Sequence, residues 1–240
     1  MELLKIGCCG FPLLKIPYGK QFSVVEVQQT FYQPPMRQST LEGWRKLLPA
    51  PFEFTLKAWQ LITHTMKSPT FRRLKVKLSP EELEQCGSFQ WTPIVQQAWE
   101  KSRACAQALD ARLVLFQCPA SFTAEPHNIE RMRRFFHSIE RSGLKLLWEP
   151  RGNWGLDLIE ELCRELDLVH AVDPFVSQSV TKDFVYFRLH GGKDFSHVFT
   201  SDELTGMVRL IPKKAPAYVM FNNRNMLEDA KTFQRQILAT

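Results

Sequence analysis

The sequence predicts a single α/β domain of the TIM-like (β/α)8 barrel type, and three observations support this prediction. The 240 residues are close to the roughly 250 typical of a one-domain barrel. Short apolar runs alternate with helical segments, which favours parallel strands because parallel pairing needs crossover connections. Polar residues recur where the apolar runs end, on the face where barrels carry their sites. We therefore expect residues 1–240 to form one domain.

Eight short runs have the composition of strands that are buried on both faces, because each is apolar and mostly bounded by turn or polar residues. These runs are Leu3–Cys9, Ser23–Gln28, Phe52–Lys57, Leu113–Cys118, Leu144–Glu149, Leu168–Val172, Phe184–Leu189 and Ala217–Phe221. Eight such strands in one domain favour closure into a barrel over an open sheet.

Helical patterns lie between most of these strands. Thr40–Leu48 carries its apolar residues on one stripe, and Pro93–Leu109 has proline at its first helical position. The other predicted helices are Glu125–Glu140, Asp157–Glu165, Ser201–Ile211 and Met226–Leu238. We expect Ser201 to cap its helix without a full capping box, since the residue three positions later is leucine.

Two connections depart from the alternation. Phe11–Phe22 is short and contains two prolines, so it is predicted to be a loop or a stub of helix. Ala58–Trp91 is much longer than a usual strand-to-helix loop and contains Arg72-Arg73-x-Lys75-x-Lys77. We expect this long segment, residues 58–91, to form an excursion over the mouth of the barrel.

The composition constrains partners and location. The net charge of +6 favours an anionic partner, either a small molecule or nucleic acid. No apolar run approaches the roughly 20 residues that span a bilayer, and the start lacks a signal-like pattern, so we expect a cytoplasmic protein without a membrane partner. The six cysteines are scattered without a C-x-x-C pair, which indicates buried thiols rather than a disulfide framework or a zinc ribbon. Nothing in the sequence predicts an oligomeric state.

Polar residues gather at the carboxyl ends of the predicted strands. Charged side chains within apolar strands are unfavourable unless they are paired or functional. Residues two apart on a strand share a face, which relates Glu26 to Gln28 and Glu149 to Arg151. The full set is Glu26, Gln28, Lys57, Gln117, Glu149, Arg151, Asp173, Arg188, His190, Asn222 and Asn223.

The motifs around these residues resemble the YecE-like family, also called domain of unknown function 72. The first part of the match is Ile6-Gly7-x-x-Gly10-Phe11, Val25-Glu26-Val27-x-x-Thr30-Phe31-Tyr32-x-x-Pro35 and Phe54-x-x-Lys57-Ala58. The rest is Thr63-His64, Phe116-Gln117-x-Pro119-x-Ser121-Phe122, Glu149-x-Arg151-x-x-Trp154, Tyr186-x-Arg188-Leu189-His190-Gly191 and Phe221-Asn222-Asn223. The resemblance implies a TIM-like barrel and supplies no established activity. Departures at Cys8-Cys9, Cys118 and Trp59–Ile62 suggest an archaeal-looking subgroup.

The leading functional hypothesis is an enzyme that acts on a phosphate-bearing substrate, possible reactions including phosphoester hydrolysis. Lys57, Arg151 and Arg188 would hold the anion. Glu26 or Glu149 would act as general base, with His190 or His64 as acid. The remaining expected ligand contacts are Gln28, Tyr32, Gln117, Asp173, Asn222 and Asn223.

Four alternatives remain open. The charges could form an internal ion-pair network that seals the barrel end without a ligand. A divalent metal could be held by Glu26, Glu149, Asp173 and His190, although nearby cations and the absence of a metal motif disfavour it. Glu26 and Glu149 could be the paired carboxylates of a glycosidase. The Arg72–Lys77 stretch could instead belong to a non-catalytic nucleic-acid-binding module.

Overall fold

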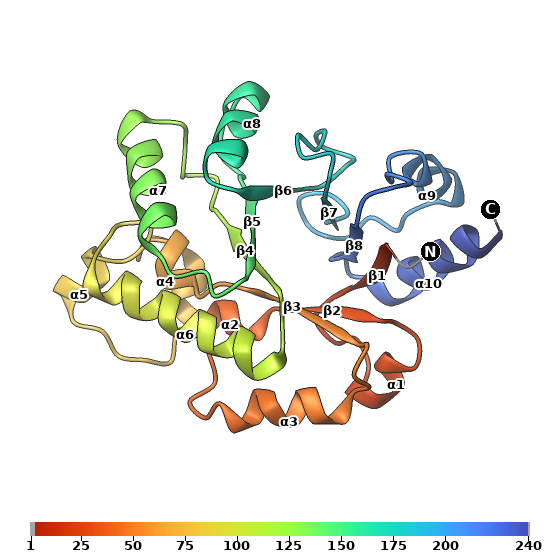
Figure 1. The fold of residues 1–240 in the computed structure, drawn as a ribbon, viewed down its shortest axis with the longest axis horizontal. Helices are drawn as coiled ribbons and strands as arrows, with labels where there is room; N and C mark the ends of the chain where they lie inside the picture. The colour runs from red at the N-terminus through yellow and green to blue at the C-terminus, as the bar shows by residue number, and fades with distance from the viewer. Residues whose placement is uncertain (1–2, 240) are drawn as a thin grey trace.

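The computed structural model describes residues 3–239 and confirms the barrel (Figure 1). Eight strands pair in sequence order, every pair is parallel, and the first strand closes the barrel against the last. The strands are β1 (Leu4–Cys9), β2 (Val24–Val27), β3 (Glu53–Lys57), β4 (Leu113–Gln117), β5 (Lys145–Glu149), β6 (Leu168–Val172), β7 (Val185–Leu189) and β8 (Ala217–Phe221). Each observed strand lies within one of the predicted runs, so the pattern of buried strands was read correctly.

One strand end was predicted wrongly, and it bears on the site. β2 ends at Val27, and Gln28 has helical backbone angles (φ −88°, ψ −25°) as the residue that precedes helix α2. The expected sharing of one strand face by Glu26 and Gln28 is therefore wrong, because the chain has already turned at Gln28. The amide of Gln28 nevertheless reaches back and donates a hydrogen bond to the Glu26 carboxylate.

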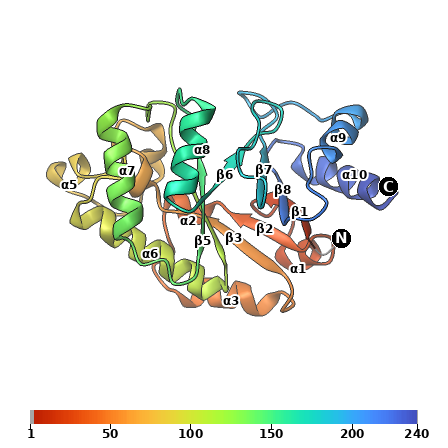
Figure 2. The same ribbon diagram turned by 45° about the horizontal axis from the view of Figure 1, so that its top comes forward.

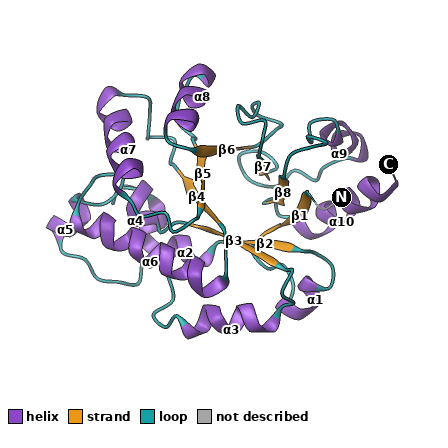
Figure 3. Ribbon diagram, in the orientation of Figure 1, coloured by secondary structure: helices purple, strands orange, loops and turns teal. Residues whose placement is uncertain are grey.

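Helices surround the strands, which occupy the centre of the molecule (Figure 3). The longer helices are close to the predicted ones, and all helices are α1 (Lys15–Gly19), α2 (Gln29–Tyr32), α3 (Ser39–Leu47), α4 (Gln60–Thr63), η1 (Pro69–Arg73), α5 (Pro80–Glu84), α6 (Pro93–Leu109), α7 (Pro126–Ser138), α8 (Leu156–Glu165), α9 (Ser201–Val208) and α10 (Met226–Ala239). None of the helices in residues 3–239 is long and apolar enough to cross a membrane.

The predicted cap of α9 is wrong by one residue. Thr200, not Ser201, is the N-cap, and its hydroxyl accepts a hydrogen bond from the backbone N–H of Glu203. The Glu203 carboxylate in turn accepts from the Thr200 backbone N–H, which completes a capping box. A threonine followed three positions later by glutamate was the sequence signal that identifies this start.

The long segment 58–91 contains α4, η1 and α5 and packs beside the barrel. α4 contacts α6, and the Arg73 guanidinium lies 3.4 Å from the ring centroid of Tyr32 at the end of α2. The segment returns against α4 at Gly87, where a β-carbon would lie 2.4 Å from the His64 backbone and φ is +85°. α5 lies at the periphery, beside α6 and α7 (Figure 2). Coverage of the barrel mouth by this segment stays a prediction.

Two apolar layers hold the fold. The larger one lies between the strands and the helices, with the rings of Phe89, Phe116, Phe135 and Phe136 in mutual contact. The smaller one fills the barrel itself and consists of Cys9, Val24, Leu113, Leu115, Leu147, Val169, Ala171, Tyr186 and Met220. Because side chains alternate along a strand, the residues two positions beyond these inward-facing ones also face the interior, one layer nearer the mouth.

Candidate functional site at the barrel mouth

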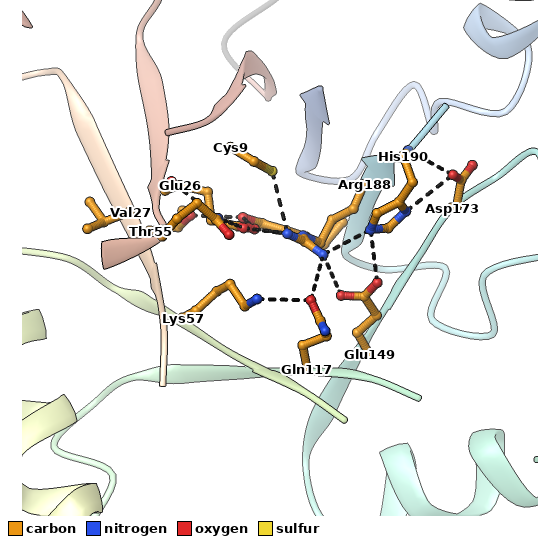
Figure 4. Close-up of polar contacts among 12 residues, drawn as sticks. Cys9, Glu26, Val27, Thr55, Lys57, Gln117, Glu149, Asp173, Arg188 and His190 are labelled. Carbon is orange, nitrogen blue, oxygen red and sulfur yellow. Dashed lines mark hydrogen bonds and ion pairs between the residues drawn. The ribbon is translucent and has the colours of Figure 1, made fainter. Parts of the chain in front are cut away.

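The layer at the mouth end of the barrel is built almost entirely from charged and amide side chains (Figure 4). Each follows an inward-facing residue of its own strand by two positions, as Arg188 follows Tyr186 and Glu149 follows Leu147. The structure therefore brings together the predicted residues Glu26, Lys57, Gln117, Glu149, Asp173, Arg188 and His190, along with Arg151.

Arg188 on β7 bridges the two glutamates. Its Nε and Nη2 donate to the two carboxylate oxygens of Glu26 at 3.0 and 2.7 Å, a bidentate pairing. Its Nη1 donates to Oε2 of Glu149 at 2.5 Å. Arg188 and Glu26 are both 0% exposed. The guanidinium is thus engaged by protein carboxylates on both sides, and its observed contacts are those of an internal charge pair.

Glu26 has further donors that keep it ionised. The Tyr186 hydroxyl donates to its Oε2 at 2.8 Å and is itself 2.8 Å from the Thr55 hydroxyl. Burial alone would raise the pKa of Glu26, but the charge and hydrogen bonds of Arg188 outweigh it and hold the pKa below its ordinary value of 4.5. Glu26 is therefore a poor proton acceptor at neutral pH.

Glu149 at the end of β5 is held between two guanidiniums. Besides Arg188, it accepts a hydrogen bond at 3.0 Å from Nε of Arg151, whose side chain is 32% exposed. Burial alone would raise the pKa of Glu149, but Arg188 and Arg151 hold it well below its ordinary value, with a further contribution from His190. Glu149 is consequently a fixed negative charge that orients Arg151 toward the mouth.

His190 is held in a defined orientation by Asp173. The Asp173 carboxylate accepts the backbone N–H of His190 at 2.9 Å and lies 3.3 Å from its Nδ1. The opposite ring nitrogen, Nε2, lies 3.1 Å from Nη1 of Arg188 and 3.2 Å from Oε1 of Glu149, and also contacts Arg151. With Nδ1 on the Asp173 side, Nε2 is the nitrogen that the two guanidiniums contact.

Lys57 at the end of β3 is the buried cation of the cluster that has no carboxylate partner among the described residues. Its Nζ donates to Oε1 of Gln117 at 2.9 Å and lies 3.9 Å from the ring centroid of Phe31. The residue is 4% exposed. Burial lowers the pKa of Lys57 from 10.5 to about 7, and the nearby charge of Arg188 adds to this effect.

His64 and Tyr32 lie at the edge of the cluster. The His64 ring packs 4.9 Å from that of Phe31, and its Nδ1 is 2.8 Å from the Thr63 hydroxyl. Burial lowers the pKa of His64 to about 3, helped by the positive charge of Lys57, so the ring is neutral at neutral pH. Tyr32 is stacked by Arg73 on the rim.

The two predicted asparagines differ in placement. Asn222 is half-buried beyond β8, and its backbone N–H donates to the Leu189 carbonyl at 2.8 Å. Asn223 is buried, and its Nδ2 donates to the His197 carbonyl at 2.8 Å and to the Asp229 carboxylate at 2.6 Å. The observed contacts of Asn223 tie the loop after β7 to α10, whereas Asn222 is the one nearer the mouth.

Sequence reasoning missed four residues that support the cluster. Tyr186 and Thr55 share a hydrogen bond below Arg188 and Lys57, Cys9 accepts a contact from Arg188 Nη2 at 3.6 Å, and Phe31 lies against the Lys57 ammonium. Tyr186 and Thr55 precede Arg188 and Lys57 by two positions, so the period of two could have revealed them. For Cys9 and Phe31, the only indication in the sequence was that they lie within the family motifs.

The cysteines are confirmed as buried thiols. All six are free and buried, and burial raises the pKa of each. Cys8 and Cys118 belong to the layer between strands and helices, and Trp148 Nε1 donates to Cys118 Sγ at 3.4 Å. Within residues 3–239, no group of three or more histidine, cysteine, aspartate or glutamate side chains is placed to hold a metal ion.

A cleft of about 550 Å³ opens at the mouth beside β5, β6 and β7. This volume lies within the range of roughly 300–1,000 Å³ that small-molecule sites occupy. Its polar wall is made by Glu149, Arg151, Asp173 and His190, and its apolar wall includes Trp154, Leu156, Ile159 and Val176. Arg151 and His190 therefore line the cleft, whereas Arg188 is 0% exposed and is not among its lining residues.

Comparison with solved structures shows the same fold in proteins of low sequence identity. A DUF72 family protein from Enterococcus faecalis V583 is 18% identical, with a TM-score of 0.76 and coverage of 99% of this chain and 98% of that chain. A DUF72 family protein from Thermotoga maritima MSB8 is 20% identical, with a TM-score of 0.65 and coverage of 98% and 99%. D-psicose 3-epimerase from Clostridium cellulolyticum H10, solved with D-tagatose, is 10% identical, with a TM-score of 0.56 and coverage of 98% of each chain.

A comparison with curated proteins finds no match. The sequence of residues 16–239 matches the model of the family described as protein of unknown function DUF72, which confirms the resemblance seen in the motifs. With that match and a closed eight-stranded barrel shared with two DUF72 structures, this chain belongs to the DUF72 family.

Proposed function

We propose that the barrel mouth binds a small phosphate-bearing molecule, with Lys57 and Arg151 as its cationic contacts and His190 as the group that moves a proton during a reaction on it. Arg188 has a different role in this proposal from the one expected from the sequence, because both of its faces are already occupied by Glu26 and Glu149. The proposal keeps the reaction class open between hydrolysis and isomerisation.

Lys57 is the observation that carries the proposal. An ammonium group has three donors, and Lys57 uses one of them on Gln117 while facing an aromatic ring and a second cation. Burying a cation without a carboxylate is unfavourable, so a polypeptide retains such a group where a ligand completes its contacts. A phosphate oxygen would supply the missing negative charge and accept from the free donors.

His190 is the best placed proton-transfer group. Asp173 orients the ring through Nδ1, and Arg151 contacts Nε2, so a ligand that engages Arg151 would leave Nε2 able to act as base and then as acid. The two glutamates fit this role less well because their pKa values are held below the ordinary range. A glycosidase also needs one protonated carboxyl group, and the Arg188 pairing disfavours a protonated form of either glutamate.

The likeness in fold to sugar epimerases suggests what the part of the ligand beyond its phosphate is. One barrel of this fold is named D-psicose 3-epimerase and was solved with D-tagatose. At 10% identity the likeness concerns the fold, so it suggests only that a polyhydroxylated substrate fits a cleft at the mouth.

Nucleic acid is the second candidate, and one observation favours it. Arg72, Arg73, Lys75 and Lys77 are exposed, while the intervening Leu74 and Val76 pack against the core. This alternation displays a row of cations on one side of the segment, as a phosphate backbone would need. A small molecule remains the better candidate because Lys57 is buried, and a strand of nucleic acid lying on the exposed row of cations would not contact it.

Binding of inorganic phosphate tests the proposal. We expect phosphate to raise the Tm of the wild-type protein and to bind with a measurable Kd in calorimetry at low salt. Lys57→Met and Arg151→Met should each weaken binding by about tenfold or more, since a hydrogen bond to a charged group contributes about 1.5–3 kcal/mol. Lys145→Met is the matched control, because Lys145 begins β5 at the opposite end of the barrel. Equal phosphate binding by Lys57→Met, Arg151→Met and the wild type would exclude this site.

A further inference from the structure

We propose that Lys57 is a covalent catalytic residue whose amine forms an imine with the carbonyl carbon of a phosphorylated aldehyde or ketone. The inference rests on the proposed phosphate site and narrows its substrate class: Arg151 keeps the phosphate while Lys57, its second contact on entry, bonds to the carbonyl carbon. It follows from the position of one amine at the mouth, which lies beside Gln117 and close to Arg188 (Figure 4). The ring of Phe31 lies against the same amine.

The geometry around Lys57 suits a nucleophilic amine. Its Nζ is the end of an inward-facing side chain at the last residue of β3, in the layer that faces the mouth. Its one hydrogen bond goes to a neutral amide oxygen, which Arg188 Nη1 also approaches at 3.5 Å. No described carboxylate forms an ion pair with Nζ, and the effect of burial and Arg188 on its pKa outweighs that of Glu26 and Glu149.

The neighbours favour the neutral amine further. The ring of Phe31 lies against Nζ on one side, and the charge of the fully buried Arg188 acts on it from within the cluster. A lysine that is desolvated and placed near another cation is a recognised form of activated amine nucleophile. The pKa of about 7, lowered first by burial and then by Arg188, agrees with this geometry.

The reaction balances without an external oxidant or reductant. The Nζ lone pair forms a bond to the carbonyl carbon, the carbonyl π bond opens, and one proton passes from the nitrogen to the oxygen to give a carbinolamine. The nitrogen then loses its second proton and forms the C=N bond as the hydroxyl group takes up a proton and leaves as water. The sum is amine plus carbonyl compound giving imine plus water, and uptake of one proton gives the cationic iminium.

The surroundings can hold the cationic iminium. Glu26 and Glu149 are fixed negative charges whose influence on Lys57 favours its charged state. A substrate phosphate near Arg151 would add negative charge on the solvent side of the mouth. An electron-withdrawing iminium would ease removal of a proton from the neighbouring carbon by His190, which lies in the same cluster across Arg188. Such removal is a step common to isomerisation and carbon–carbon cleavage.

Reductive trapping tests the inference on the wild-type protein. Glycolaldehyde phosphate and the uncharged glycolaldehyde form a matched pair of probes, each used with cyanoborohydride at pH 7 and followed by peptide mass mapping. Hydride reduction converts an imine into a stable secondary amine. We expect glycolaldehyde phosphate to label Lys57 at least about tenfold faster than exposed lysines such as Lys145 and Lys193, because more of its amine is unprotonated. Inorganic phosphate should slow this labelling.

The outcomes separate the imine from the phosphate site. Labelling confined to exposed lysines, with phosphate still raising the Tm, would overturn the imine and leave the proposed phosphate site standing. Equal labelling of Lys57 by both probes, with no effect of phosphate on Tm, would support the amine and overturn the phosphate site. Lys57→Arg retains the charge without the nucleophile, so it should bind phosphate and lose trapping at this position. The wild-type mapping remains decisive if that variant does not fold.

Discussion

The two ends of the barrel differ in how far their ion pairs are buried. At the amino-terminal end, Lys5 and Glu53 form an ion pair at 2.9 Å with side chains that are 24% and 37% exposed. At the mouth, Arg188 pairs with Glu26 and Glu149, and all three side chains are at most 5% exposed. Water screens the pair of Lys5 and Glu53 but is excluded from the pairs of Arg188. Ion pairs with similar contact distances therefore differ strongly in free energy.

The difference in burial indicates which end of the barrel carries a functional site. Exposed pairs contribute about 0–1 kcal/mol and need no further explanation. A buried charge network contributes little more to stability than apolar packing of equal volume would, yet removal of one partner is strongly destabilising. Retention of several interdependent charges at the mouth, with Lys57 left without a carboxylate, therefore favours a role in binding or chemistry over a purely structural one.

The largest expected effect comes from breaking the central pairing. Arg188→Met leaves Glu26 and Glu149 buried without their shared cation and should lower the free energy of unfolding by about 3–5 kcal/mol, measured by urea denaturation. Lys5→Met at the other end should cost about 0–1 kcal/mol. Similar losses for the two variants would mean that the two ends are screened alike, which contradicts the comparison.

A smaller contrast is expected between two tyrosines. The Tyr186 hydroxyl donates to the buried Glu26 at 2.8 Å, and the Tyr218 hydroxyl donates to the half-exposed Glu53 at 2.6 Å. Tyr186→Phe should cost about 1.5–3 kcal/mol because a bond to a buried charge is lost, whereas Tyr218→Phe should cost about 1 kcal/mol or less. Denaturation of both variants under one condition measures the contrast, and a larger loss for Tyr218→Phe would reverse it.

The smallest expected effect, counted for each pH unit, is the change in stability that titration of Lys57 causes. Its pKa is about 7 in the folded protein, below the ordinary 10.5. The unfolded chain therefore binds more protons at this residue between these two pH values, so its contribution to stability rises with pH at up to about 1.4 kcal/mol per unit. The stability of the wild type relative to Lys57→Met should rise over this window in denaturation measured at several pH values. A flat difference would show that Lys57 stays protonated.

Much of the fold and of the site could be predicted because both depend on short-range periodicity. Apolar runs identified the eight strands, and the C-terminal ends of five of them gave Glu26, Lys57, Gln117, Glu149 and Arg188. The family match then confirmed the motifs around them. A period of two fixes the face on which a side chain lies, and in a closed barrel that is enough to place it inside.

The pairings within the barrel could not be predicted from the same pattern. Which carboxylate meets Arg188 depends on the stagger of strands that are distant in sequence, so its capture by Glu26 and Glu149 was not visible. The turn at Gln28 was missed because its helical backbone angles follow from the short helix behind it. The partners of Asn223 Nδ2 lie 26 and six residues away in sequence, so the pattern could not predict these hydrogen bonds either.

The Arg188 bridge also has a consequence for the order in which the protein folds. Glu149 is 39 positions from Arg188 in sequence, whereas Glu26 is 162 positions away on the other side of the closure between β8 and β1. Contacts between such distant positions form only after a large loss of chain entropy. During folding, Arg188 can thus pair early with Glu149, and its second carboxylate arrives only when the first and last strands meet. We therefore expect the bond to Glu26 to form after the barrel closes. Its principal kinetic effect would then be to lower the unfolding rate rather than to raise the folding rate.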